Sequence, residues 1–368
     1  MLGLLIAVIA GAATLTGCQS GDSINGPGSD TIFDVMKVLT QQYNDSGNTG
    51  GDKAFVPGNK LTGDQSYTVS GDSHCGKITY NASNQPPDGS SAGINALVAD
   101  TDGCVDWARS SRGRSSSDPS NLEFYAFAKD AVSWARFGGS CPGGDAGPAG
   151  CGPTNLTTAQ LKGIFICDQP GGLPKFTNWA QVGGDNEPIT RYLPQIGSGT
   201  LSFFETRILG LASAQQGVVD DTSCAHRPTR AQENSGNLVA DSDKVRTILP
   251  YSFAQITSQG NGTVPDIRGG AVIGNINGVA PSKTTVGNNS FLGVRYVYNV
   301  AKTTSPSYDR VINYIGVAPT SDGGNGFLCA NNGDVQSTIS KYGFVPLSLA
   351  PAGPGLPSSR CRKNPPPL

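Results

Sequence analysis

The stretch R-Y-L-P-Q-I-G-S-G-T-L-S-F-F-E-T-R-I-L, from Arg191 to Leu209, decides the fold, because a glycine-serine-glycine-threonine turn opens directly into an apolar-periodic segment. The apolar side chains recur at helical spacing, at Leu201, Phe204, Ile208 and Leu209. We therefore expect a helix that begins at or just after Ser198. The free N–H groups of its first turn would point outward and favour negative charge.

The G-S-G-T turn has the composition of a site for a tetrahedral oxyanion. Gly197 and Gly199 let the backbone approach a ligand closely, and Ser198 and Thr200 add hydroxyl donors. Phosphate is the obvious candidate. A simpler interpretation is that Ser198 only caps the helix after a flexible turn. Other segments must decide between the two.

The N-terminus resembles a lipoprotein signal. Residues 1–17 carry no charge, and the apolar run from Leu2 to Ala13 is too short to span a bilayer but suits a signal peptide. We expect cleavage before Cys18, lipidation of that residue, and a tether over residues 18–27 that holds the protein on the extracytoplasmic face of the cell membrane. A signal peptide normally starts with Lys or Arg, which Met1-Leu2-Gly3 lacks, and this leaves open a start further upstream. A buried N-terminal element is the alternative.

Cysteine usage indicates an oxidising compartment. Of nine cysteines, eight remain after Cys18: Cys75, Cys104, Cys141, Cys151, Cys167, Cys224, Cys329 and Cys361. Eight cysteines can pair completely. The sequence contains no C-x-x-C motif and only two histidines, His74 and His226, so four structural disulfides are favoured over a zinc site. The sequence does not choose the pairs, although a local one such as Cys141 with Cys151 is plausible.

The charge balance excludes a nucleic-acid-binding function. With 26 basic and 28 acidic residues, the chain has no net positive charge that would attract nucleic acid. Fifty glycines and 25 prolines indicate many turns and long ordered loops. The length suffices for two lobes.

Helical and strand-like segments alternate along the chain, which favours an α/β fold. The pattern predicts helices over 32–43, 94–98, 156–165, 198–209 and 308–317, and strands over 77–80, 104–113, 125–137, 189–192, 245–256 and 292–299. Two more loops of small and hydroxyl residues, 28–31 and 89–93, lead into helices. These three helix starts and the polar end of the predicted strand 104–113 could form one site.

Together these segments resemble the substrate-binding lipoprotein of bacterial high-affinity phosphate ABC transporters, in a cysteine-rich actinobacterial-like branch. The landmarks are G-S-D-T at 28–31, G-S-S-A-G at 89–93, V-D-W-A-R-S-S-R-G at 105–113, L-T-T-A-Q-L-K-G-I-F at 156–165, N-W at 178–179 and R-Y-L-P-Q-I-G-S-G-T at 191–200. The resemblance implies a type II periplasmic-binding fold with two lobes, two crossing segments near 125–137 and 249–254, and the ligand in the interlobe cleft. It divides the chain into lobe 1 (28–124 and 254–350), lobe 2 (125–253) and a proline-rich tail (351–368).

The resemblance also implies the phosphate ligands. These are Thr31, Ile32, Ser90, Ser198, Gly199 and Thr200, with Ser111 at the position of the family's anion-facing aspartate. Arg191 is the favoured cation, although it lies further from G-S-G-T than the family's arginine, and Arg109 or Arg112 could replace it. A carboxylate that accepts the proton of hydrogen phosphate rejects sulfate. Because Ser111 cannot do this, we hypothesise that Asp30 does; the alternative is an N-cap.

The expected function is binding of inorganic phosphate and its delivery to an ABC transporter permease, by a monomer without cofactor, metal or covalent chemistry. Other oxyanions, a phosphorylated small molecule or a surface sensor role remain alternatives. A serine hydrolase is a further alternative, because G-S-S-A-G matches G-x-S-x-G with Ser91 as nucleophile and His226 as a possible base. No strand runs into that serine, which argues against it.

Overall fold

The computed structural model describes residues 23–47, 53–58, 61, 64–70, 75–142, 150–166, 175–212, 229–316, 326–330, 332–348, 361–366 and 368. The predictions for the signal peptide, Cys18, Cys167, Cys224 and His226 lie outside these residues. Among the described residues, no helix is both long and apolar enough to cross a membrane.

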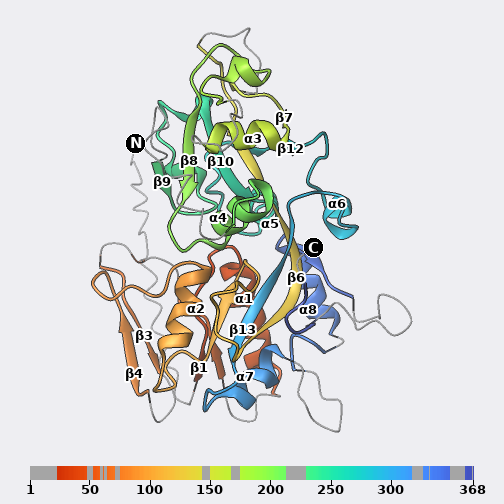
Figure 1. Cartoon of the computed structure of the whole chain (residues 1–368). Helices are drawn as coiled ribbons and strands as arrows, with labels where there is room; N and C mark the ends of the chain where they lie inside the picture. Colours follow the sequence, from red (N-terminus) through yellow and green to blue (C-terminus); the bar gives the residue numbers. More distant parts are fainter. Residues whose placement is uncertain are drawn as a thin grey trace, which may run out of the picture.

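The chain forms two lobes, one above the other in Figure 1. Lobe 1, the lower one, contains β1 (Ser23–Asn25), α1 (Phe33–Asp45), β2 (Lys53–Phe55), β3 (Tyr67–Ser70), β4 (Lys77–Tyr80), α2 (Ser90–Ala99), β5 (Trp107–Ser110), α7 (Tyr308–Ile315), α8 (Gly333–Lys341) and β14 (Val345–Pro346). The predicted strand 77–80 and the predicted helices at 32, 94 and 308 are confirmed.

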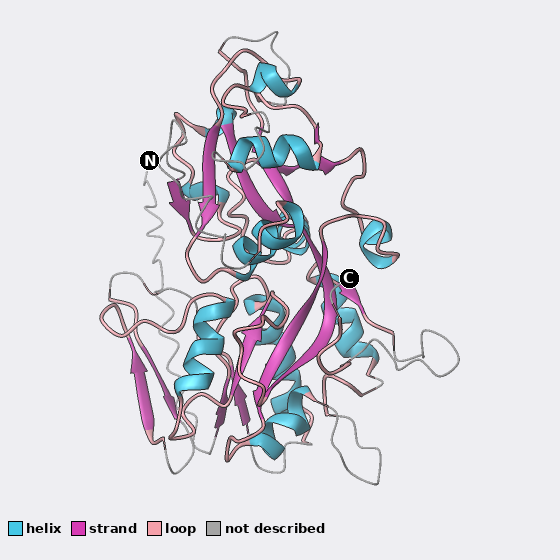
Figure 2. Ribbon diagram, viewed as in Figure 1, coloured by secondary structure: helices cyan, strands magenta, loops and turns pink. Residues whose placement is uncertain are grey.

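Lobe 2 contains β7 (Asn155–Leu156), α3 (Thr158–Phe165), a 3-10 turn (Trp179–Val182), β8 (Thr190–Pro194), α4 (Gly199–Phe203), a π-helical turn η2 (Phe204–Ile208), β9 (Thr229–Ala231), two short 3-10 turns (Gly236–Leu238 and Lys244–Arg246), β10 (Thr247–Ser252), β11 (Ala271–Ile273), β12 (Asn275–Ile276) and α6 (Lys283–Gly287). Figure 2 shows the mixed α/β character of both lobes. The expected fold class is confirmed.

Two long strands join the lobes. β6 (Leu122–Phe137) pairs with β13 (Val294–Lys302) over its first half and with β10 and β11 over its second half. The largest sheet among the described residues therefore runs through both lobes in the order β5-β13-β6-β10-β8-β9, with β11 and β14 also on β6. β6 is buried along nearly its whole length, as expected for a strand covered on both faces.

The structure differs from three expectations of the sequence. β11 pairs with the lobe 2 end of β6, and β12 pairs with β7, so residues 271–276, like α6, lie with lobe 2 and not with lobe 1. The first expected crossing lies in β6, but the second long connecting strand is β13 and not residues 249–254, which belong to β10 and the start of α5 (Phe253–Gly260). The predicted strand over 245–256 ends at Ser252, and α5 follows. Ser252 is its N-cap, because its hydroxyl accepts a hydrogen bond from the backbone N–H of Gln255 at 3.2 Å.

Glycine permits the close approach of the two lobes. The N–H of Ser91 in lobe 1 donates to the carbonyl of Gly197 in lobe 2 at 3.0 Å. Gly89 has a φ of +101°, and a Cβ there would lie 2.6 Å from the same carbonyl oxygen. Both facts require glycine at this position. The loops at the starts of α2 and α4 therefore meet backbone to backbone.

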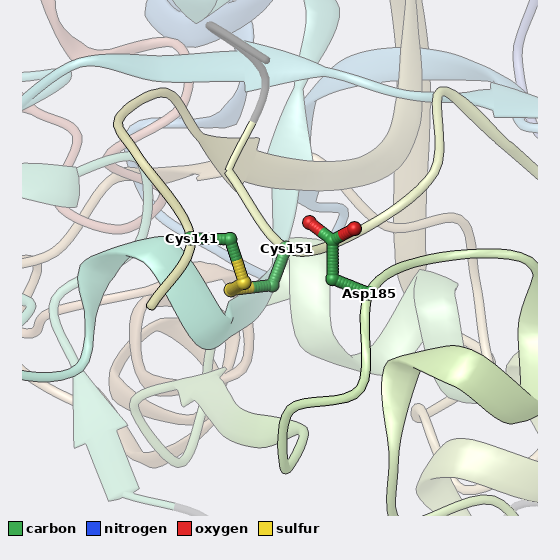
Figure 3. A group of neighbouring side chains, drawn as sticks. All are labelled: Cys141, Cys151 and Asp185. Carbon is green, nitrogen blue, oxygen red and sulfur yellow. A yellow bond between two sulfur atoms is a disulfide. The ribbon is translucent and has the colours of Figure 1, made fainter. Parts of the chain in front are cut away.

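Among the described residues, three disulfides join six of the predicted cysteines: Cys75–Cys104, Cys141–Cys151 and Cys329–Cys361. Cys141, Cys151 and Asp185 form a close group in lobe 2 (Figure 3). Because the two thiols are consumed in the disulfide, no thiolate is left there to bind zinc. The Asp185 N–H donates to the carbonyl of Cys151 at 2.9 Å, so the group stabilises the local structure of lobe 2.

Candidate functional site

The loops at the starts of α1, α2 and α4 come together where the lobes meet, as their shared composition predicted. Thr31 Oγ1, just before α1, lies 3.2 Å from Thr200 Oγ1 in the first turn of α4. Both threonines are fully buried. We call this junction the cradle and define it by Thr31, Ser198 and Thr200.

The cradle holds a carboxylate that the sequence did not reveal, that of Glu233. Its Oε1 accepts hydrogen bonds from Thr31 N–H at 3.1 Å and from Thr31 Oγ1 at 2.8 Å. Its Oε2 accepts from the Ser198 hydroxyl and from Thr200 N–H, the latter at 3.4 Å. Four donors from two lobes thus converge on one oxyanion.

Ser198 has both of the roles that the sequence left open. It is the N-cap of α4, since its Oγ accepts from the backbone N–H of Leu201 at 3.1 Å, and it donates to Glu233. The helix continues as the π-helical turn η2, so the backbone runs on without a break to Ile208. π-Helical turns frequently occur at functional sites.

A cluster of hydroxyls lies directly beside the cradle. Ser90 Oγ is 3.2 Å from Ser111 Oγ and accepts from Ser111 N–H at 2.9 Å. Ser29 Oγ donates to Ser111 Oγ at 3.0 Å. A Cβ added to Gly199 would collide with the hydroxyls of Ser90 and Ser111, so the backbone of α4 packs directly on this cluster.

Arg295 of β13 brings a positive charge to the cradle. Its Nη2 donates to Thr200 Oγ1 at 3.0 Å, and its Nη1 donates to the carbonyl of Ser111 at 3.0 Å. Nη2 also forms an ion pair with Asp130 at 2.7 Å, in which the two side chains are 2% and 0% exposed. Asp130 in turn accepts from Ser252 Oγ at 2.8 Å and Ala254 N–H at 2.9 Å. Its charge is thereby satisfied, as a buried charge requires.

The three arginines expected from the sequence make other contacts, and their role as phosphate ligands stays a prediction. Arg191 is buried on β8, with Nη1 3.5 Å from the carbonyl of Phe165 within lobe 2. Arg109 donates to the carbonyls of Gly26, Gly28 and Ser29, and burial lowers its pKa to about 10. These bonds hold the loop before α1 in place.

Arg112 forms a bidentate pair with Asp118 at 2.7 and 2.9 Å and donates to Ser91 Oγ at 3.0 Å. Ser91, the residue that would be a hydrolase nucleophile, therefore faces a guanidinium, which is no base. It lies in the first turn of α2, whose N-cap is Gly89. Ile32 is the fully buried N-cap residue of α1.

Asp30 is buried beside the cradle but is bonded to a different set of groups. Its Oδ2 accepts from the side-chain amides of Gln195, at 3.0 Å, and Gln232. The same two amides reach Asp88 at 3.5 and 3.0 Å. Burial, together with Asp88 and the charge of Glu233, raises the pKa of Asp30 well above its ordinary value. The raised pKa disfavours the ionised form that a proton-accepting selectivity carboxylate needs, and the selectivity role of Asp30 stays a prediction.

A cavity of about 620 Å³ lies between the lobes next to this site. Four arginines line it, Arg112, Arg114, Arg207 and Arg295, together with aromatic side chains that include Phe203 and Tyr296. The Arg295 guanidinium lies 5.8 Å from the ring centroid of Phe203. The volume is in the range of small-molecule pockets.

Comparisons with known proteins agree with this architecture. A model of the PBP superfamily domain matches residues 51–328. A putative phosphate ABC transporter substrate-binding protein with bound phosphate, from Clostridium perfringens, is 18% identical with a TM-score of 0.57, over 89% of this chain and 100% of that chain. An ABC-type phosphate transport receptor from Vibrio cholerae is 19% identical with a TM-score of 0.54, over 88% and 99%. At these identities the likeness establishes the fold.

Proposed function

From the premise that the chain belongs to the periplasmic-binding-protein (PBP) superfamily, we propose that it binds inorganic phosphate between its lobes and delivers it to the permease of an ABC transporter. One observation carries the proposal: N–H and hydroxyl donors from both lobes converge on a single oxyanion, the Glu233 carboxylate. The site therefore has the chemistry needed to hold an anion. Phosphate is the ligand named for the Clostridium perfringens structure of the same fold.

Phosphate would use the same donors. Thr31, Ser198 and Thr200 would donate to its oxygens, and Arg295 would supply positive charge next to Thr200. Hydrogen bonds to an ionised acceptor are roughly twice as strong as neutral ones. Because the cradle is shielded from water, each of them gains further strength. Lobe closure thereby converts binding into a conformational signal that a permease can recognise.

The N-terminal sequence supports a location on the extracytoplasmic face of the membrane. We propose that Cys18 carries a lipid that anchors a monomer on the extracytoplasmic face of the membrane. The three disulfides suit an oxidising compartment. No covalent step or cofactor is needed for capture and release, so we assign no enzymatic activity.

The arginine-lined cavity favours a second candidate ligand, a phosphorylated small molecule. Inorganic phosphate needs no space of about 620 Å³, whereas an organic phosphate could place its remaining part there among Arg207, Phe203 and Tyr296. Ser111, which offers a hydroxyl where a selectivity carboxylate was expected, leaves sulfate as a further competitor.

Thermal unfolding tests these possibilities together. The chain from residue 19 onward, stripped of phosphate, is heated with phosphate, sulfate, molybdate or phosphorylated small molecules. At a thousandfold excess over its Kd, a specific ligand stabilises by about 4 kcal/mol, a shift of several degrees. We expect this shift with phosphate. A larger shift with an organic phosphate would favour the second candidate, and no shift with any anion would refute the proposal.

A further inference from the structure

Glu233 behaves as an anion bound in the cradle, although it is part of the chain. It follows β9 in lobe 2, and its side chain is buried, with 2% of the residue exposed. Oε1 faces Thr31 of lobe 1, while Oε2 faces Ser198 and Thr200 of lobe 2. The carboxylate thus bridges the lobes, as a ligand between them would.

A second anion cannot share these donors. The backbone N–H groups of Thr31 and Thr200 each provide one proton, and both are directed to Glu233. Two anions at one set of donors would also repel each other strongly in a buried site. Phosphate and the Glu233 carboxylate therefore exclude each other from the cradle.

Displacement of the carboxylate requires rotation of the Glu233 side chain, because hydrogen bonds hold the backbone around it in place. The N–H of Glu233 donates to Gln195 Oε1 at 2.7 Å. The following residue, Asn234, donates from Nδ2 to Thr31 Oγ1 at 3.3 Å, and its Oδ1 accepts from Ser252 N–H at 3.0 Å. These bonds keep the segment at the cradle whichever way the Glu233 side chain points.

We propose that Glu233 is a built-in competing ligand, which holds the lobes together in the absence of phosphate and which phosphate must displace to bind. The proposal rests on the proposed function and adds a regulation to it. Competition lowers the apparent affinity in proportion to the fraction of molecules whose cradle is free. Glu233 therefore determines the phosphate concentration at which the receptor becomes half-saturated.

Two variants and one matched control test the proposal. Glu233→Ala removes the competitor, and Glu233→Gln keeps its size without its charge. The control Glu187→Ala removes another lobe 2 carboxylate, which pairs with Arg246 away from the cradle. Phosphate Kd is measured by titration calorimetry on the chain from residue 19 onward. We expect Kd to fall at least about tenfold in Glu233→Ala, to fall less in Glu233→Gln, and to stay unchanged in the control.

Small-angle scattering without phosphate gives an independent readout. Loss of the bridge should increase the radius of gyration of Glu233→Ala relative to wild type and control, and phosphate should restore it. If wild type binds phosphate but Glu233→Ala binds it equally or more weakly, Glu233 is no competitor, although the proposed function stands. If neither binds phosphate, the proposed function fails. An unchanged radius of gyration would overturn the bridging role in either case.

Discussion

Thr31 Oγ1 of lobe 1 lies 3.2 Å from Thr200 Oγ1 of lobe 2, so the two lobes meet through a pair of hydroxyls at the point where an anion is held. Each hydroxyl also has a charged neighbour, Glu233 for Thr31 and Arg295 for Thr200. Lobe closure therefore brings the charged groups of Glu233 and Arg295 to the same pair of hydroxyls.

Thr31→Val should weaken phosphate binding. The change keeps the shape of the side chain but removes a hydroxyl donor, and a hydrogen bond to a charged group contributes about 1.5 to 3 kcal/mol. Because this hydroxyl also donates to the competing Glu233 carboxylate, the change is made in the Glu233→Ala variant, where we expect Kd to rise roughly ten- to hundredfold by titration calorimetry. The control Thr40→Val, in the same variant, removes a buried hydroxyl bonded to Tyr314 instead and should leave Kd unchanged. Equal Kd values for Glu233→Ala with and without Thr31→Val would place phosphate elsewhere.

Gly199→Ala should prevent the lobes from closing. The new Cβ would overlap the hydroxyls of Ser90 and Ser111 in lobe 1, and the backbone of α4 would have to move away. Overpacking of this kind costs about 1 to 3 kcal/mol. Phosphate affinity should fall at least about tenfold, while Gly333→Ala, where a Cβ meets open space, should behave as wild type. Unimpaired binding by Gly199→Ala would show that closure at this contact is not needed.

Arg295→Met should destabilise the protein. It leaves Asp130 buried without its ion pair, which costs about 3 to 5 kcal/mol. Urea unfolding should report this loss, and phosphate affinity should fall with it. The partly exposed pair between Arg268 and Asp266 provides the control, since Arg268→Met should unfold at nearly the wild-type urea concentration. Similar midpoints for both variants would mean that the Arg295 pair contributes no net stability.

Asp30→Asn should flatten the dependence of stability on pH. Because burial raises the pKa of Asp30, the folded protein binds more protons than the unfolded chain at pH values above the ordinary pKa of an aspartic acid. Stability therefore falls as pH rises towards the raised pKa. Asparagine cannot titrate, so unfolding free energies from pH 4 to 8 should decline less than in wild type. A decline as steep as that of wild type would assign the dependence to other groups.

Local sequence patterns predicted much of the fold and part of the site. The glycine and hydroxyl residues before α1, α2 and α4 do converge, because helix starts with free N–H groups occupy one end of each lobe. Long-range pairing could not be predicted in this way. Glu233 follows a short strand, and its position depends on contacts with Thr31, which lies 202 residues earlier in the chain.

Two features carried a signal that we did not use. Arg295 interrupts an alternating strand at a buried position, and a cation there needs a partner. Ser252 and Gln255 have the spacing of a capping box, which marks the end of β10 and the start of α5. Apolar residues up to Ile256 continued the strand-like pattern and concealed this boundary.

A crystal structure of the chain from residue 19 onward, grown in phosphate, tests the central claim most directly. The account predicts a tetrahedral anion within hydrogen-bond distance of Thr31 N–H, Ser198 Oγ and Thr200 N–H, with the Glu233 carboxylate rotated away. Phosphate bound elsewhere, or a cradle still filled by Glu233 at saturating phosphate, would contradict it.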